Sequence, residues 1–541
     1  MSDPFIPPET LDAQLREQLA AALPEPLWQK LNGSLQREQQ RLRSTEERLR
    51  LAEYKVRLLE ERLRLMRLNK YGPGSEKLSD AQLALLEVEP GVSVIEVAAE
   101  SQREPLIAPR PAKPAARPHP GRQQLPAHLP RVERLIACTP EQCICGQCGK
   151  PTRFIGYEQS EQLDVEPAKY FVLVTKREKR ACETCEEQGV ACAPLPARII
   201  EKGLASDRVV IDTVVRKYSD HLPLYRQSVI LERETGLQIS RATLDGWVMQ
   251  VGDLLRPIVG AMRQELLGGC YLQADETTVG VQMHDGRGQN HQAYLWQYGQ
   301  PRGSVVFDFR LGRERDGPKR FLGDFAGRLQ SDGYGAYDHV GGQGLVHVAC
   351  WAHARRKFFE AVKLNAQDVT ALEIVAQMDA LFALDAQARA GALSLEARHE
   401  LRLQNAPPLL EQLKAGIEAA RAGALPQSAL AKACAYTLTL WGRLTRFLDY
   451  PEVELSNNLA ENSMRPVALG RKNWIHIGSK EAGPRVANIL SVVETCRRLV
   501  LPVRDYLAAV LPGLADFPVQ RVGELTPAVW ATHRERPKAE G

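Results

Sequence analysis

Three acidic residues stand in contexts that suit metal-dependent chemistry. Asp275 follows the strand-like run Tyr271–Ala274, Asp332 follows Leu329–Ser331, and Glu461 lies in a segment of helical composition. Carboxylates delivered from two strand ends and a facing helix suit a pair of divalent ions that breaks and joins phosphodiester bonds. Carboxylates are hard oxygen ligands, so the expected ions are Mg²⁺ or Mn²⁺. Each acid alone is equally explained as a solvated residue, and the prediction rests on the three together.

The elements around these acids follow a recognisable order. Three strands in a meander are followed by helix, strand, helix, strand and helix, which is the order of a ribonuclease-H-like core. In that core the first and fourth strands are neighbours, so Asp275 and Asp332 would converge. Residues 365–455 are rich in Ala, Leu, Arg, Gln and Glu and predict an all-helical insertion, which separates Asp332 from Glu461. The strands are expected at 271–274, 293–298, 304–309, 329–331 and 345–350, with helices near 319–325 and 352–362.

Other polar residues near these segments receive smaller roles. Glu276 neighbours Asp275 but should point to the opposite face of the strand. Cys350 and His353 have C-x2-H spacing, for which packing of the insertion against the core is favoured over metal binding. The basic residues at 355–357 are interpreted as a solvated helix face.

Two C-x2-C pairs predict a second kind of metal site. Four thiolates complete a tetrahedral structural zinc site and leave no open position for catalysis. Cys143 is an alternative ligand, and reduced cysteines without metal are the competing interpretation. The intervening segment Tyr170–Val174 is expected to form a strand of a zinc ribbon. The predicted ligands of one Zn²⁺ are Cys145, Cys148, Cys182 and Cys185.

A heptad of apolar residues runs through the N-terminal region without Pro or Gly. A narrow stripe with this spacing is typical of a coiled coil, which would form a homodimer or higher oligomer. A single amphipathic helix lying on a core is the alternative. The Pro-rich stretch 101–131 predicts an extended linker. The heptad positions are Leu35, Leu42, Leu49, Val56 and Leu63.

Several basic residues are candidates for DNA contacts. Gly236 makes a turn between two helical segments, and Ser240 is placed to cap the second helix, which begins with Arg241. This pattern resembles a helix-turn-helix, although many helical hairpins share it. After Glu461, a second basic group would contact DNA phosphates rather than only solvent. Its members are Arg465, Arg471 and Lys472.

Composition sets the broad class of the protein. The chain has 541 residues, 44% hydrophobic content and a net charge of +4, so several folded domains are expected and any basic surface must be local. No apolar run reaches the ~18 residues of a membrane helix. The N-terminal sequence lacks the apolar core of a secretory signal, which predicts a cytoplasmic protein.

Taken together, these motifs resemble the transposases of the insertion-sequence 66 family of bacterial mobile elements. The resemblance spans roughly residues 35–530 and includes the zipper, its ending at Gly74–Leu78 and the C-x2-C pairs. It continues through Gln273–Thr277, Ser331–Tyr334, Cys350–Arg356, Asn458–Arg465 and Gly470–Trp474. Ile475-His476 departs from the apolar-aromatic pair usual after this tryptophan.

The resemblance implies a function and partners. Asp275, Asp332 and Glu461 would be a DDE catalytic triad that holds two metal ions. The substrates would be the terminal inverted repeats of the element and its target DNA, with accessory proteins encoded in the same element. A metal-dependent nuclease and a non-catalytic DNA-binding protein are the alternatives.

The expected fold class is multidomain α/β, with nine segments along the chain. They are an N-terminal segment (1–34), a coiled coil with a following helix (35–100), the linker (101–131), a zinc-binding domain (132–200), a helical DNA-binding region (201–265), the catalytic core in two parts (266–364 and 456–490) around the insertion (365–455), and a C-terminal helical module (491–541).

Overall fold

The computed structural model describes residues 18, 20–71, 170–175, 179–181, 190–192, 196–201, 203–283, 285–286, 288–365 and 368–535. The linker and the four predicted zinc ligands lie outside these residues. The chain divides into two compact units. The first comprises Met1–Ala108, Leu195–Glu232 and Leu237–Gly541, and the second comprises Pro109–Pro194 with Arg233–Gly236.

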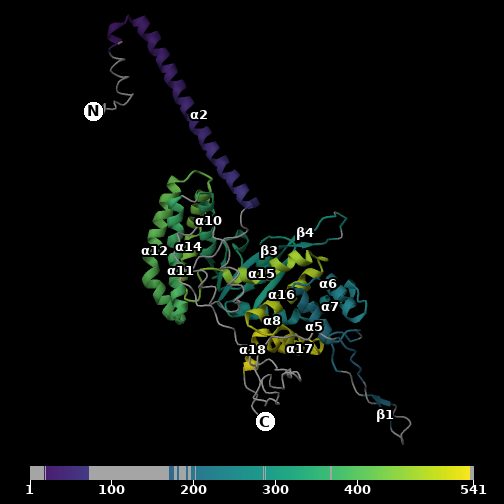
Figure 1. Ribbon diagram of the computed structural model, residues 1–541. Coiled ribbons are helices and arrows are strands. Elements are labelled where there is room, and N and C mark those ends of the chain that lie inside the picture. The colour runs from purple at the N-terminus through teal and green to yellow at the C-terminus, as the bar shows by residue number, and fades with distance from the viewer. Residues whose placement is uncertain are drawn as a thin grey trace, which may run out of the picture. The chain divides into compact units, whose positions relative to one another are not determined.

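A mixed sheet forms the centre of the first unit (Figure 1). Its strand order is β5-β4-β3-β6-β7, and β8 pairs with the far end of β3. The first three strands form an antiparallel meander, whereas β6 and β7 run parallel to β3. The strands are β3 (Tyr271–Val281), β4 (His291–Gly299), β5 (Val305–Arg310), β6 (Arg328–Ser331), β7 (Val346–Ala349) and β8 (His476–Ile477).

Strand β3 is longer than the sequence suggested. The prediction ended it before Asp275, but β3 continues to Val281 and Asp275 is an internal residue. The extension pairs with β4 on one edge and with β8 on the other, so its backbone groups are satisfied. Thr277, Thr278 and Val279 are β-branched, which suits them to an extended backbone.

The connection from β6 to β7 also differs from the prediction. Instead of a helix it contains only a 3-10 turn, Gly335–Tyr337. Glycine is frequent between these strands, and Gly333 adopts φ +86°, a left-handed conformation that stops regular structure. The chain therefore turns sharply directly after Asp332.

Helices α15 (Asn458–Trp474) and α16 (Ala482–Arg498) pack against the meander strands. Helix α16 also covers the exposed edge of β5. The hydroxyls of Ser491 and Thr495 accept hydrogen bonds from the backbone N–H groups of β5, at 2.8 and 2.9 Å. These two donors of the edge strand are therefore not available to pair with another chain.

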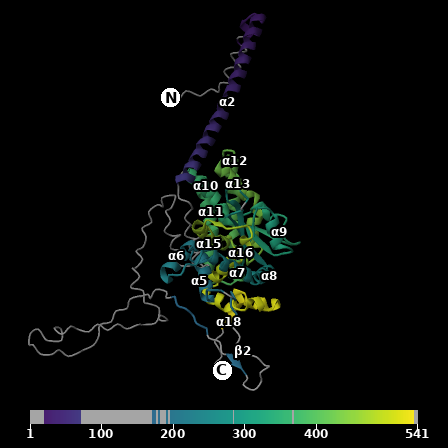
Figure 2. The same ribbon diagram turned by 90° about the vertical axis from the view of Figure 1, so that its right-hand side faces the viewer.

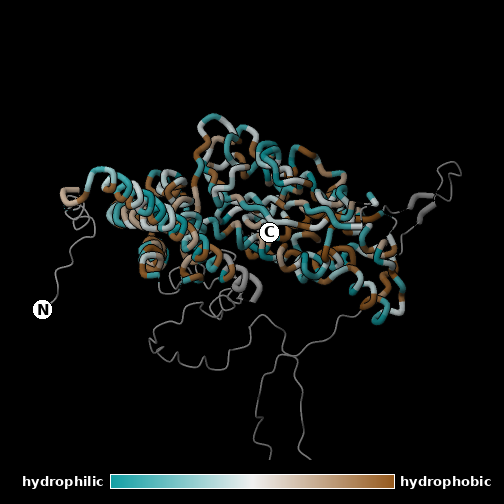
Figure 3. The backbone as a smooth tube through the Cα atoms, turned by 90° about the horizontal axis from the view of Figure 1, so that it is seen from above, coloured by the Kyte–Doolittle hydropathy of each residue, from teal (hydrophilic) through white to brown (hydrophobic). Residues whose placement is uncertain are grey.

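A helical bundle follows the sheet (Figure 1). It consists of α10 (Trp351–Leu364), α11 (Val369–Ala390), α12 (Leu395–Gly423), α13 (Ala429–Thr439) and α14 (Trp441–Leu444). These helices share one hydrophobic core with β7 and with Tyr271 of β3. Figure 3 shows hydrophobic and hydrophilic residues interspersed along the backbone, as expected when each helix buries one face.

Helices α5 (Asp207–Tyr218), α6 (Leu224–Thr235), α7 (Arg241–Leu254) and α8 (Arg256–Gly268) precede the sheet (Figure 2). Gly236 takes φ +69° in the turn after α6. The predicted cap of α7 is present, because the Ser240 hydroxyl accepts a hydrogen bond from the N–H of Thr243 at 3.1 Å. Helices α16, α17 (Val503–Val510) and α18 (Pro527–Glu535) end the described chain.

The N-terminal helix α2 spans Glu25–Tyr71 and contains the whole heptad. Four of the heptad side chains described on it, Leu42, Leu49, Val56 and Leu63, are exposed. Burial of this stripe on a core of the same chain, the alternative considered from the sequence, is therefore not observed. No helix in the described residues is both long and apolar enough to cross a bilayer.

The second unit contains a short antiparallel ladder between β1 (Lys179–Ala181) and β2 (Val190–Cys192). The strand expected at Tyr170–Val174 is absent. The described residues 170–175 have no strand partner, and an extended segment becomes a strand only when its backbone groups pair.

Candidate active site

The strand register aligns the first two predicted acids. Gln273 of β3 pairs with Gln330 of β6, and Asp275 and Asp332 each lie two residues further along. Asp332 is the first residue beyond β6. Its carboxylate accepts a hydrogen bond from the N–H of Tyr334 at 2.8 Å, which closes the turn after the strand.

The third acid reaches the sheet through an ordered segment at 454–457. The Gln330 side chain donates to the carbonyl of Glu454 at 2.7 Å, and the Gln273 side chain donates to that of Ser456 at 3.0 Å. Helix α15 begins immediately afterwards, with Glu461 in its first turn. Two buried glutamine side chains therefore fix where this helix starts.

Helix α10 provides the positive charges next to Glu461. The carboxylate of Glu461 lies 3.1 Å from the guanidinium of Arg356 and 3.5 Å from Nε2 of His353, both of which are on α10. Oxygen Oε1 is nevertheless buried and, within the described residues, has no hydrogen-bond partner. A buried carboxylate oxygen in this state is costly and can accept a further ligand.

The charge of Glu461 acts on Asp275. Burial, and then the charges of Glu461 and Glu276, raise the pKa of Asp275 to about 8. Burial also acts to raise the pKa of Glu461, but Arg356 and His353 outweigh it and lower that pKa. Burial would lower the pKa of His353, whereas Cys350 and Glu461 raise it to about 9. Glu461 thus carries the negative charge, and Asp275 tends to keep its proton.

Asp332 is grouped instead with Glu276. The Glu276 carboxylate is bound by Arg313 at 2.5 Å and by the Tyr337 hydroxyl at 2.9 Å. Burial raises its pKa, and the charge of Asp332 contributes in the same direction. Asp275 and Glu276 have different partners, as expected for neighbours on opposite strand faces.

These contacts define how far the triad is assembled. Glu461 acts electrostatically on Asp275, while the charge of Asp332 acts on Glu276 and Arg313. Among the described residues, no group of three His, Cys, Asp or Glu side chains is arranged to hold a metal ion. Glu276 links Asp275 to Asp332 electrostatically. Its charge raises the pKa of Asp275, and the charge of Asp332 raises the pKa of Glu276.

The predicted basic residues have different environments. The charge of Arg465, one turn after Glu461, contributes to lowering the pKa of that acid. Arg471 donates to the hydroxyls of Thr277 and Thr278 at 3.0 and 3.1 Å and so ties the end of α15 to β3. Lys472 is exposed, as is Arg241 at the first position of α7.

The prediction of a solvated face at 355–357 is wrong for Arg355, whereas Arg356 and Lys357 are exposed. Arg355 is only 5% exposed and binds both carboxylate oxygens of Asp379 on α11. Arg356 binds Glu461, and only Lys357 lacks such a contact in the sequence-predicted cluster. His353 also lies in the site. The C-x2-H spacing from Cys350 drew attention to His353 in the sequence, but it did not predict that His353 would pair with Glu461.

A second set of charges, which we call the buried ionic cluster, was not predicted. Glu454 binds Arg389 at 2.6 Å and Arg398 at 2.9 Å. Arg402 binds Asp385 at 2.5 Å. Burial would raise the pKa of Glu454, but the three arginines outweigh it and lower the pKa to about 2. The cluster joins α11 and α12 to the segment that leads into α15.

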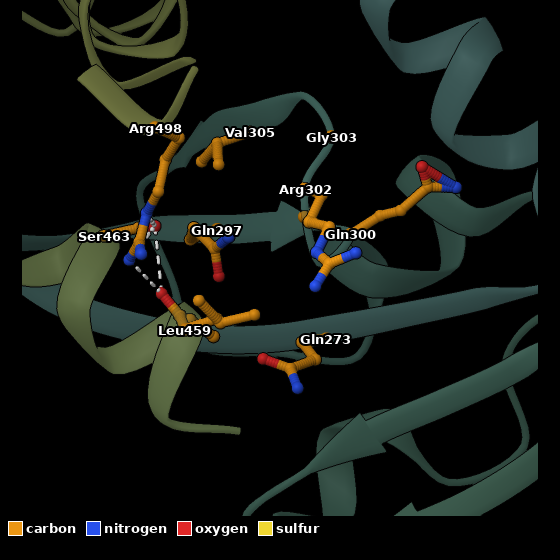
Figure 4. Close-up of a pocket in the computed structure, with 11 residues that line it drawn as sticks. Gln273, Gln297, Gln300, Arg302, Gly303, Val305, Leu459, Ser463 and Arg498 are labelled. Atoms are coloured by element: carbon orange, nitrogen blue, oxygen red, sulfur yellow. Dashed lines mark hydrogen bonds between the residues drawn. The ribbon is translucent and has the colours of Figure 1, made fainter. Parts of the chain in front are cut away.

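The first turn of α15 is also supported from α16 (Figure 4). Arg498 donates to the carbonyl of Leu459 at 2.6 Å and to the hydroxyl of Ser463 at 3.1 Å. A cavity of about 10 Å³ lies beside these contacts, lined also by Gln273 and Gln297. That space suits about one water molecule, so the region supports the helix and does not admit a substrate.

Three family models match the chain. "Transposase IS66 family" covers residues 202–485, "zinc-finger binding domain of transposase IS66" covers 142–186, and "Transposase C of IS166 homeodomain" covers 58–134. Two similar proteins come from Sinorhizobium fredii (strain NBRC 101917 / NGR234). Uncharacterized protein y4qI is 32% identical over 490 residues, covering 85% of this chain and 87% of the relative. Uncharacterized protein y4jD is 34% identical over 407 residues, covering 72% and 78%.

Proposed function

This chain belongs to the IS66 family of transposases, and we propose that it cleaves and joins DNA at the ends of an insertion sequence through Asp275, Asp332 and Glu461. The observation that carries the proposal is that Asp275 and Glu461, two acids far apart in sequence, are both half-buried, and that the charge of Glu461 acts on Asp275. Asp275 and Asp332 also hold matching positions, two residues beyond the paired Gln273 and Gln330. A fully solvated surface role does not account for these partly buried positions.

The sheet supports a ribonuclease-H-like core as part of this proposal. The order β5-β4-β3-β6-β7, with an antiparallel meander followed by two parallel strands, is the order expected for that core. In this arrangement β3 and β6 supply acids from adjacent strands, and α15 supplies the third from outside the sheet.

The donors present fit Mg²⁺ or Mn²⁺. They are carboxylate oxygens, and Oε1 of Glu461, which accepts no hydrogen bond within the described residues and lies 3.5 Å from Nε2 of His353, is available to a cation. Asp275, Asp332 and Glu461 would hold two ions. When bound, such ions activate the attacking hydroxyl and stabilise the leaving oxygen of a phosphodiester.

The remaining side chains would position the acids and the DNA. His353 and Arg356 pair with Glu461, and Arg313 and Tyr337 bind Glu276, whose pKa responds to Asp332. Exposed Lys472 and Arg241, with Arg465, would contact phosphates. Arg471 was predicted to do the same. Its contacts to β3 support a positioning role in addition.

The flanking regions complete the proposed architecture. The zinc-finger match supports Zn²⁺ binding, for which Cys145, Cys148, Cys182 and Cys185 are the proposed ligands. Strand β1 ends at Ala181, directly before Cys182, which suits a metal-binding loop between two short paired strands. The exposed heptad of α2 would pair with a second copy of the chain. The segment boundaries predicted from the sequence are retained in this proposal.

The test is cleavage of DNA carrying the ends of the element by purified full-length protein with Mg²⁺. We expect Asp275→Asn to reduce cleavage at least ~10³-fold, because it removes a metal-binding charge while preserving the shape of the side chain. Asp449→Asn, at an exposed acid paired with Arg446, is the matched control and should cleave normally.

Near-normal cleavage by Asp275→Asn would contradict the assignment of the active site. Cleavage without joining to target DNA by the wild type would instead favour the nuclease alternative. Binding of DNA with no cleavage under any divalent ion would favour the non-catalytic alternative.

A further inference from the structure

A pocket outside the acidic site lies where α15 ends. It is bordered by α5, by α7 and by the connection from α15 to α16, and its volume is about 250 Å³. Pockets for drug-sized ligands measure ~300–1,000 Å³, so this one suits a smaller group, such as one heterocyclic base. We call it the Trp474 pocket.

The pocket combines an aromatic wall with polar groups. Trp474 is half-buried and lines it, held in place because its indole packs over Gly470, where a Cβ would lie 2.6 Å from Nε1. Any of the four DNA bases can stack on such a ring. Ser479, near the beginning of α16, lines the same pocket.

The opposite wall offers charge and hydrogen bonding. Lys217 and Tyr218 of α5 and Asp245 of α7 all line the pocket. Burial lowers the pKa of Lys217, and the charge of Asp245 opposes this change. Tyr218 is only 2% exposed, although its hydroxyl is polar. An ammonium, a phenol and a carboxylate around an aromatic ring can bind the edge of a base and its phosphate.

The residue after Trp474 is exposed and conformationally strained. Ile475 has φ +65° and ψ −55°, close to the rare classic γ-turn, and its side chain is 66% exposed. A β-branched residue is unfavourable there unless its surroundings impose the conformation. Ile475 lies between Trp474 and His476, both of which line the pocket, and follows the basic residues Arg471 and Lys472.

We propose that the Trp474 pocket binds one unpaired base of the DNA and that Ile475 enters the base stack at the position the base has left. Apolar side chains of this kind open base steps in other DNA-binding proteins. The proposal rests on the proposed function, since it takes DNA as the ligand. It adds a site that recognises a distorted or unpaired position rather than the phosphate backbone.

The test compares two labelled duplexes of identical sequence, one fully paired and one with a single extra unpaired nucleotide. Fluorescence anisotropy with full-length wild-type protein should show roughly tenfold tighter binding to the duplex with the unpaired nucleotide. Trp474→Ala and Ile475→Ala should each bind the two duplexes with equal affinity. Trp474→Phe should keep most of the preference, because a ring remains.

Val500→Ala is the control for Ile475→Ala. Val500 is also β-branched, has φ +55° and is 81% exposed, but it lies outside the pocket. It should keep the full preference. Because Ile475 is exposed, its replacement should leave the melting temperature within a few degrees, so a lost preference would not reflect unfolding.

Equal affinity of the wild type for the two duplexes, or a preference kept by both Trp474→Ala and Ile475→Ala, would overturn the pocket assignment. Either result leaves the cleavage proposal in place, which Asp275→Asn tests separately. A wild type that binds neither duplex would contradict the DNA function on which the pocket assignment depends.

Discussion

Two groups of buried acids lie close to the β3–β6 pair, and they are neutralised to different extents. Three arginines hold Glu454 of the buried ionic cluster as a carboxylate, with a pKa of about 2. Asp275 lies next to other acids and has a pKa of about 8, with His353 as the opposing charge. Similar burial therefore gives opposite pKa shifts, depending on the partners.

This difference separates a structural role from a functional one. The arginines of the buried ionic cluster balance the negative charge of Glu454, which therefore requires no further cation. The cluster also connects the helical bundle to the start of α15. The acids around Asp275 are balanced less completely, because the charges of Glu461 and Glu276 oppose the ionisation of Asp275. Charges left unbalanced in this way reduce stability and suit cation binding.

The largest expected effect on stability comes from Glu454→Gln. It removes the buried carboxylate that Arg389 and Arg398 bind, which should lower the free energy of unfolding by about 3–5 kcal/mol. Urea denaturation at pH 7 measures the change. Glu411→Gln, on the exposed face of α12, is the control and should change stability by less than ~0.5 kcal/mol.

The same variant makes a pH test possible. The pKa of Glu454 is lowered from 4.5 to about 2 in the fold, so its contribution is complete above about pH 4.5 and disappears as the pH falls toward 2. The stability difference between wild type and Glu454→Gln should shrink across this window. A difference that stays constant would contradict the role of charge in the cluster.

Asp275→Asn should change the stability of the fold in the opposite direction from Glu454→Gln. The pKa of Asp275 is raised from 3.8 to about 8 in the fold, so ionisation lowers the stability of the wild type progressively between about pH 4 and pH 8. Without divalent ions, the variant should be more stable than the wild type at pH 8 and equal to it near pH 4. Thermal denaturation measures both, and added Mg²⁺ should stabilise the wild type only. A destabilised variant at pH 8 would show that Asp275 is a structural acid.

The smallest expected effect on stability comes from Arg356→Gln. Arg356 is 45% exposed, so its pairing with Glu461 contributes less than ~1 kcal/mol. Because it competes with a cation for Glu461, its loss should strengthen Mn²⁺ binding several-fold, as measured by calorimetry. Arg446→Gln, which breaks an exposed pair with Asp449, should leave Mn²⁺ binding unchanged. Weaker Mn²⁺ binding by Arg356→Gln would mean that Arg356 holds Glu461 in its binding position.

Much of the local structure could be read from the sequence. Strands β4, β5, β6 and β7 fall within two residues of the expected segments, and the heptad and Ser240 correctly indicated a long helix and a helix cap. These features depend on short-range patterns: side-chain alternation, seven-residue spacing and a hydroxyl next to free N–H groups. The end of β3 was misplaced because its polar extension is stabilised by pairing, with β4 along its whole length and with β8, almost two hundred residues away, at Gly280 and Val281.

The amino-acid sequence by itself determined the family, the three acids and the order of elements that could bring them together. Only the tertiary structure decided which charges surround each acid. It paired Glu461 with Arg356 and His353, placed Asp332 beside Glu276, and built the buried ionic cluster from helices of the insertion. The physical reason is that charge pairing and burial depend on distances between segments remote in sequence, which no local pattern records.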